Sequence, residues 1–304
     1  MPVELASWPA ILRSPSAPIV RTFLDKTRFG GEAWAEPVGA LGRSGSLEVR
    51  LAASSKEVRR AQRLRYKVFH EEGSAVPSAR SRLSRRDIDP FDEICDHLLV
   101  FDHDVVTKPF RKAKPKVVGT YRLLRREAAD RRLGFYSASE FEIRPLLDRH
   151  ADARILELGR SCVLKPYRSR ATLALLWQGI WAYVRHHGCQ VMIGCASLEG
   201  TDPDALALPL SYLHHHAASP PDWRVRARRG RRTSMDRMAA DEIDARVAFR
   251  RLPPLLKGYL RLGATVGDGA VIDHDFGTTD VFVVLPIGSI GERYIDHFTP
   301  VEPA

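Results

Sequence analysis

Short stretches in which apolar residues alternate with polar ones, or run together, recur along the chain and predict β-strands. The most informative one covers residues 155–164, because it leads through a polar turn at 165–170 into a region of helical spacing. From Ala171 onward apolar residues recur four positions apart, as at Trp177 and Trp181, which predicts a helix. A strand that passes through a basic turn into a helix N-terminus predicts an anion site, because the first N–H groups of a helix have no intrahelical acceptor.

A second helix is predicted after Ser54, which stands three residues before Glu57 in the spacing of a capping box. Its core-facing positions include Ala61 and Leu64, and Arg65 lies on the same side. An unpaired buried charge is costly, so Arg65 is expected either to have a partner or function, or to reach outward to solvent.

The remaining pattern completes an α/β fold, with a mixed sheet and helices packed on it in one domain with insertions. We expect this domain at residues 47–286, after a tail at 1–46 and before a tail at 287–304. Residues 11–29 of the first tail mix apolar and basic positions, which fits either an amphipathic membrane anchor or a poorly ordered tail. The other predicted elements are strands at 47–53, 97–101, 117–124, 190–197, 269–276 and 279–285, helices at 137–150, 201–216 and 253–262, and loops at 74–86 and 105–116.

Charge and composition narrow the function classes. The 304 residues carry a net charge of +10, which favours an acidic partner such as a carrier protein, nucleic acid or an anionic membrane surface. No apolar run is long enough for a transmembrane helix, and the beginning of the chain lacks the pattern of a secretory signal. The four cysteines have no metal-ligand spacing and are expected to be buried thiols of a cytoplasmic protein. Neither the dinucleotide fingerprint nor the P-loop occurs.

Three charged clusters invite a chemical interpretation. Five acids, at positions 87, 89, 92, 93 and 96, precede the strand at 97–101; they predict either a site for a cation or substrate ammonium, or a solvated turn. The run His214–His216 lies on a predicted helix, where consecutive side chains diverge, so no metal is expected there. Residues 223–232 contain six arginines.

Several of these residues stand in motifs of a known family. Arg65 in LRYKVF, Asp89 and Asp92 in DPFD, Arg122 in GTYRLL and Glu157 with Arg160 in ELGRS are similar to motifs of the acyl-homoserine-lactone synthases, which have the GNAT fold. The stretches FDEICDHLLV, ELGRSCVLKPYR, CASLEGTDPDALALPLSYLHHH and LLKGYLRLGATVGDGAVIDHDFGTTDVFVVL resemble the L-ornithine N-alpha-acyltransferases of bacterial ornithine-lipid synthesis more closely. The resemblance covers residues 47–285.

The resemblance implies a GNAT-like, mostly antiparallel central sheet flanked by helices, with a C-terminal extension. It implies transfer of a 3-hydroxyacyl chain from the 4'-phosphopantetheine arm of acyl carrier protein to the α-amine of L-ornithine, giving lyso-ornithine lipid. No further cofactor and no nucleic acid partner are expected, and the location is cytoplasmic or peripheral on an anionic membrane. One departure is at residues 167–172, where YRSRAT replaces the glycine-rich phosphate loop of other GNAT enzymes, which favours a carrier-protein donor over coenzyme A.

The resemblance also assigns roles to individual residues. The candidate catalytic residues are Glu157, as the base that deprotonates the amine, Arg160, which could instead pair with an acid, and Ser161. Arg65 and Arg122 are candidates for the substrate carboxylate, and Asp89 and Asp92 for the side-chain ammonium. On the donor side, a backbone N–H near Cys162 or Val163 would stabilise the oxyanion, and Arg168, Ser169 and Arg170 would meet the pantetheine phosphate.

Two alternatives remain at this stage. The nearer one is another carrier-protein-dependent N-acyltransferase, which would make a homoserine lactone or acylate glycine. The other is a basic non-catalytic module that binds membrane or nucleic acid through residues 223–232. That module would leave the acidic cluster, Glu157 and Arg160 unexplained.

Overall fold

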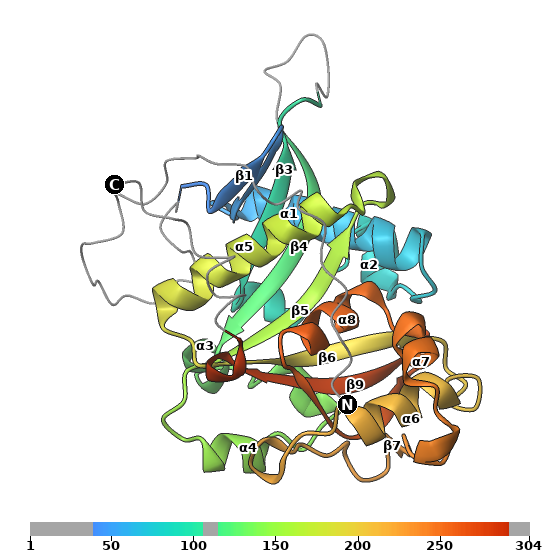
Figure 1. Cartoon of the computed structure of the whole chain (residues 1–304). Helices are drawn as coiled ribbons and strands as arrows, with labels where there is room; N and C mark the ends of the chain where they lie inside the picture. The colour runs from blue at the N-terminus through green and yellow to red at the C-terminus, as the bar shows by residue number, and fades with distance from the viewer. Residues whose placement is uncertain (1–38, 106–114, 292–304) are drawn as a thin grey trace.

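The computed structural model of this protein describes residues 39–105 and 115–291. They form a nine-stranded sheet in the order β1-β2-β3-β4-β5-β6-β9-β8-β7 (Figure 1). All neighbouring strands are antiparallel except β5 and β6, which run parallel. The strands are β1 Gly42–Ser44, β2 Leu47–Leu51, β3 Asp96–Asp102, β4 Lys116–Arg125, β5 Ile155–Val163, β6 Val191–Glu199, β7 Arg232–Thr233, β8 Thr265–Asp273 and β9 Thr278–Pro286.

Helices cover the sheet and make its connections. In Figure 1, α5 crosses the near face of β3 and β4, and α1 lies on the far face. The α-helices are α1 Ser55–Tyr66, α2 Ala79–Ser84, α3 Arg126–Asp130, α4 Arg144–Arg149, α5 Arg170–His187, α6 Ala207–His216, α7 Ala245–Arg251 and α8 Pro254–Arg261. Within the described residues, no helix combines the length and apolar character needed to span a bilayer.

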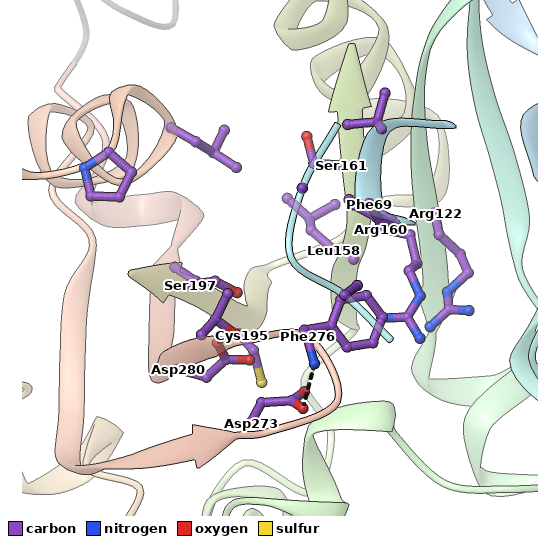
Figure 2. A pocket seen from close by; sticks show the side chains of 18 of the residues that line it. Phe69, Arg122, Leu158, Arg160, Ser161, Cys195, Ser197, Asp273, Phe276 and Asp280 are labelled. Carbon is purple, nitrogen blue, oxygen red and sulfur yellow. Dashed lines mark hydrogen bonds between the residues drawn. The ribbon is translucent and has the colours of Figure 1, made fainter. Parts of the chain in front are cut away.

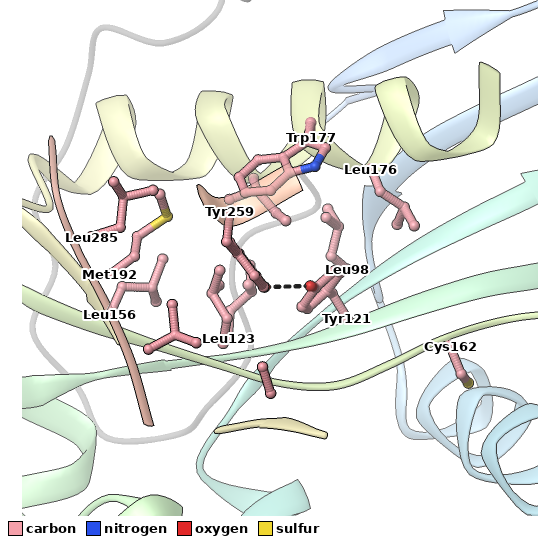
Figure 3. Packing of buried hydrophobic residues seen from close by; sticks show 14 of the residues in the cluster. Leu98, Tyr121, Leu123, Leu156, Cys162, Leu176, Trp177, Met192, Tyr259 and Leu285 are labelled. Carbon is pink, nitrogen blue, oxygen red and sulfur yellow. Dashed lines mark hydrogen bonds between the residues drawn. The ribbon is translucent and has the colours of Figure 1, made fainter. Parts of the chain in front are cut away.

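The central strand and helix form as the sequence predicts. Ser169 caps α5 by accepting a hydrogen bond from the Thr172 N–H, and Gly188 ends the helix with φ +59°. Gly179 brings α5 close to the sheet, because a Cβ there would lie 2.9 Å from Val49. Figure 3 shows Trp177 of this helix above Tyr259 of α8, with both rings over apolar side chains of the sheet. This packing holds α8 against β4, where the Tyr259 hydroxyl contacts the Tyr121 hydroxyl beside the candidate site.

Other predictions need correction. The predicted loop at 74–86 contains α2, whose N-cap is Ser78. The helix predicted at 201–216 begins only at Ala207. The sheet starts at β1, within the predicted tail, because β1 pairs with β2. The predicted anchor at 11–29 and the centre of the predicted loop at 105–116 lie outside the described residues.

Candidate active site

A pocket opens where two central strands separate. The parallel pairing of β5 and β6 joins only Ile155–Glu157 to Val191–Ile193, and the strands then diverge (Figure 1). Gly194 stands at the point of separation, where a Cβ would lie 2.4 Å from the Leu158 carbonyl oxygen. The pocket has a volume of about 470 Å³ and is also walled by the turn after α1, by α8 and by the β8–β9 turn. Figure 2 shows side chains from these elements converging on it.

A β-bulge shapes the β5 wall. Arg160 and Ser161 stand opposite the single residue Tyr121 of β4, and Arg160 has φ +49°, a left-handed conformation that non-glycine residues seldom adopt. Ser161 lines the pocket beside Tyr121. The Tyr121 hydroxyl lies 2.5 Å from the Tyr259 hydroxyl, and burial raises the pKa of both phenols. The bulge therefore directs two polar residues to the site from one strand.

Arg65 is fully enclosed by acidic partners. Its Nε lies 2.8 Å from the Asp87 carboxylate, and its two Nη atoms each lie 2.8 Å from Asp92. One Nη also donates to the Asp87 carbonyl oxygen at 2.6 Å. Burial alone would raise the pKa of Asp92, but the Arg65 guanidinium lowers it well below its usual value.

Two further arginines extend this network to the pocket wall. Arg122 donates to Asp89 at 2.6 Å and to Asp92 at 3.4 Å. Arg160 lies 3.1 Å from Asp89, and its guanidinium stacks over the rings of Tyr136 and Phe276, with centroid distances of 4.9 and 4.6 Å. Arg160 is thus paired with an acid, as the sequence allowed.

The network changes the roles that the sequence suggested. Asp89 and Asp92 already carry cationic partners, and the Arg65 side chain has no exposed surface, so these three residues are not open to a substrate. Arg122 and Arg160 do reach the pocket wall. We interpret the enclosed residues as positioning residues that fix the two arginines and the bulge.

Glu157 lies on the pocket wall below the bulge. One carboxylate oxygen accepts the Tyr136 N–H at 2.7 Å and the other accepts the Ser137 N–H at 2.8 Å. The carboxylate therefore holds the 3-10 turn Tyr136–Ser139 against β5. Burial raises the pKa of Glu157, while these hydrogen bonds act against the increase. Each oxygen retains a second lone pair for a proton or a water molecule.

A group of carboxylates that the sequence did not reveal lies across the site. Ligand oxygens of Glu140, Asp273 and Asp280 are all within 4.8 Å of one another. Burial, with a contribution from the nearby Asp280 carboxylate, raises the pKa of Glu140 to about 7. Burial also raises the pKa of Asp280. In Figure 2, Asp273 and Asp280 lie on one side of Phe276, and Arg122 and Arg160 lie on the other. The pocket thus has Asp273 and Asp280 on one wall and, on the other, two arginines that are themselves paired with Asp89.

The predicted donor residues lie at the C-terminal end of β5, just after the bulge, and at the start of α5. Cys162 is buried in the core, whereas Val163 is half-buried. Arg168 donates to the Val163 carbonyl oxygen at 3.0 Å and to Glu72 at 2.8 Å, and it lines the pocket. The Ser169 hydroxyl serves as the helix cap, and Arg170 is exposed in the first turn of α5. These positions surround a helix N-terminus, which favours an anion.

The histidine run also has a carboxylate neighbour, which the sequence did not indicate. His215 Nε2 lies 3.2 Å from Asp236 and His214 Nε2 lies 3.9 Å from it. Asp236 is mostly exposed, and His215 also contacts the Met238 carbonyl oxygen. This group lies apart from the residues that line the pocket. The absence of a metal stays a prediction.

The fold and the splayed strands with their bulge define an acyltransferase of the GNAT class. Residues 64–178 match the family model described as "Acetyltransferase (GNAT) domain". Over 258 residues the chain is 52% identical to the L-ornithine N(alpha)-acyltransferase of Brucella abortus, covering 85% of this chain and 90% of that protein. It is 51% identical to the enzyme of the same name from Rhizobium meliloti over 258 residues, covering 85% and 86% of the two chains. The chain belongs to the family of L-ornithine N(alpha)-acyltransferases.

Proposed function

We propose that this protein transfers a 3-hydroxyacyl chain from acyl carrier protein to the α-amine of L-ornithine. The observation that carries the proposal is the pocket between β5 and β6, with guanidinium groups of Arg122 and Arg160 on one wall and carboxylates of Asp273 and Asp280 on the other. Ornithine carries one carboxylate and two amines, so a pocket of this polarity suits it. The activity for which these relatives are named supports ornithine as the acceptor.

In our proposal the Glu140–Asp273–Asp280 group receives the side-chain ammonium of ornithine. Clustered buried carboxylates repel one another, and a cation between them relieves both the repulsion and the cost of burial. This assignment replaces Asp89 and Asp92, whose charges Arg122 and Arg65 already neutralise. The substrate carboxylate would then face Arg122 and Arg160, which the acidic network holds rigidly in place.

The chemical step needs a neutral amine and a stabilised oxyanion. The α-amine nitrogen attacks the thioester carbonyl carbon, the C–S bond breaks, and the pantetheine thiolate leaves. We assign the amine proton to Glu157, directly or through one water molecule, because this buried carboxylate has a raised pKa and lines the pocket. The oxyanion would be met by backbone N–H groups near Cys162 and Val163, with the Ser161 hydroxyl on the same wall.

The donor arm would enter from the start of α5. Its single phosphate would lie at the helix N-terminus beside Arg168 and Arg170, and Ser169 caps that helix. The carrier protein is acidic, which matches the net charge of +10.

The test is direct. Purified protein is incubated with one of three donors: acyl carrier protein that carries a 3-hydroxyacyl chain, acyl carrier protein that carries the same chain without the hydroxyl, or 3-hydroxyacyl-coenzyme A. Each donor is combined with ornithine, lysine, glycine or homoserine lactone. We expect a new amide only with ornithine, and most rapidly with the 3-hydroxyacyl carrier protein. Mass spectrometry identifies this product, and its fragments show that the acyl chain is on the α-nitrogen. Preference for a different amine would contradict ornithine as the acceptor. Equal rates with the acyl-coenzyme A would contradict acyl carrier protein as the donor.

A further inference from the structure

The segment at residues 76–86 stands out on the surface. Three large hydrophobic side chains of the described residues are exposed, and two of them are here: Leu83 at 91% and Val76 at 63%. The segment also contains four arginines, at positions 80, 82, 85 and 86, and no acidic residue. It thus presents apolar side chains within a basic surface.

The fold holds this segment in place. Ser78 caps α2, and Ser81 is buried beneath it. The Glu71 carboxylate pairs with Arg85, while Arg80 and Arg82 are exposed and form no ion pair among the described residues. Leu83 therefore projects from the folded helix α2, and this helix lies on the right-hand side of the molecule in Figure 1.

The segment continues directly from the pocket wall. Ser74 and Ala75 line the pocket, and Val76 is the next residue along the chain. The Ser74 hydroxyl donates to the Phe276 carbonyl oxygen at 3.0 Å, and the Val76 N–H donates to the Asp275 carbonyl oxygen at 2.7 Å. These bonds attach the exposed segment to the β8–β9 turn, so whatever binds it lies next to the pocket.

We propose that residues 76–86 bind the surface of an anionic phospholipid bilayer, with Leu83 and Val76 inserted among the headgroups. Arginines contribute attraction to anionic headgroups, and exposed aliphatic side chains gain from burial at the acyl boundary. A stable protein interface uses about 20–30 residues a side, far more than these eleven. Resting on the proposed function, a bilayer also suits a product with a hydrocarbon chain, which would leave the pocket beside an apolar phase.

The test is co-sedimentation of the full chain with vesicles of phosphatidylcholine, alone or mixed with phosphatidylglycerol. Each arginine near an anionic surface contributes about fivefold to partitioning, so Arg80→Gln with Arg82→Gln should weaken binding to the mixed vesicles roughly 25-fold. Leu83→Ser should weaken it roughly tenfold.

A matched control uses the same chemistry elsewhere. Arg131 and Arg132 are exposed beside the third exposed hydrophobic residue, Leu133, which follows α3 on the other side of the view in Figure 1. Arg131→Gln with Arg132→Gln and Leu133→Ser should leave vesicle binding unchanged. Equal effects of the two sets, or no binding of the unaltered chain to the mixed vesicles, would overturn the proposal.

Turnover without vesicles separates this proposal from the proposed function. With soluble donor and ornithine, the α2 variants should match the unaltered chain. If they lose turnover there through weaker use of the carrier protein, the segment is a protein-docking surface and the bilayer proposal fails. If the unaltered chain acylates no amine yet binds vesicles through α2, the proposed function fails and the bilayer proposal stands.

Discussion

At the scale of the residue, Glu157 and Glu140 are both buried carboxylates, but their surroundings differ. Glu157 accepts two backbone N–H groups, which stabilise its charged form. Glu140 has a thiol donor, Cys195 Sγ at 3.5 Å, and a distant arginine, Arg231 at 3.9 Å. The first environment offers hydrogen bonds to a carboxylate that could accept a proton, and the second suits a partner for an incoming cation.

Glu157→Gln tests the base. The amide keeps the volume but cannot take a proton, so turnover should fall by roughly 100- to 10,000-fold with ornithine affinity little changed. Steady-state kinetics measure kcat and the KM for ornithine, and circular dichroism shows whether the variant retains its fold. A folded variant with near-normal turnover at neutral pH would exclude Glu157 as the base.

Asp280→Asn tests the acidic wall. Loss of one charge next to the ammonium should raise the KM for ornithine by about tenfold or more, with a smaller change in kcat and in the KM for the donor. The control is Asp236→Asn, in the exposed histidine group, which should change neither constant. A donor-specific defect in the Asp280 variant would place this carboxylate elsewhere in the reaction.

Glu140→Gln should change how the free energy of unfolding depends on pH. The pKa of Glu140 is raised from 4.5 to about 7, so the folded state binds more protons than the unfolded state between these values. Stability of the unliganded protein must therefore fall as pH rises through this window. The Gln variant should lack that fall. At pH 8 its free energy of unfolding, measured by urea unfolding, should be higher than that of the unaltered chain by on the order of 3 kcal/mol. Parallel stability curves would show that Glu140 does not titrate there.

At the scale of the element, the sequence predicts best where local pattern and tertiary packing agree. β5 has strand periodicity, while α5 has helix periodicity, a Ser169 cap and an end at Gly188, and both form as predicted. β1 has only three residues and α2 only six, too few for periodicity to show. β1 is held by its pairing with β2, and α2 by Ser78, whose hydroxyl accepts a hydrogen bond from the Ser81 N–H at the start of the helix.

The residues of the candidate site also differ in how far the sequence could indicate them. The ELGRS strand and the arginines in motifs were found, because resemblance marks contiguous residues. Glu140, Asp273 and Asp280 come from three separate segments, and only the register of β8 with β9 and the turn before α4 bring them together. Residue types alone likewise suggested free acids at 89 and 92, whereas the fold pairs both with arginines.

The link between α1 and the acidic turn can be tested by Arg65→Met. The side chain keeps a similar volume but takes from Asp87 and Asp92 their shortest ion pairs, which should cost about 3–5 kcal/mol in the free energy of unfolding. Because the pKa of Asp92 is lowered in the folded state, the pair stabilises above the unfolded pKa and loses its effect as pH falls. The deficit should therefore shrink in acid. Arg63→Met, on the exposed side of α1, should cost little at any pH.

At the scale of the whole molecule, part of the excess positive charge belongs to arginines that bond to other groups of the fold. In the run at 223–232, Arg228 donates to the Ala138 carbonyl oxygen, Arg231 to that of Ser139, and Arg232 pairs with Asp268. Much of the run therefore fastens the loop to the domain and screens the acidic wall. This explains the run without a nucleic acid partner, and it leaves Arg229 exposed as a clean probe of surface charge.

Arg170→Glu and Arg229→Glu then form a matched pair, because each lowers the net charge of +10 by two and differs only in position. A glutamate in the first turn of α5 agrees with the helix dipole, so the Arg170 variant should fold normally while repelling the donor phosphate. Its KM for acyl carrier protein should rise at low salt and stay raised at high salt, because the phosphate contact is short. Attraction at Arg229 acts over solvent and is screened within about 8 Å at physiological salt, so any increase there should disappear as salt is added. Kinetics of both variants across one salt series decide between these positions. Equal salt profiles would mean that the carrier arm does not enter at the start of α5.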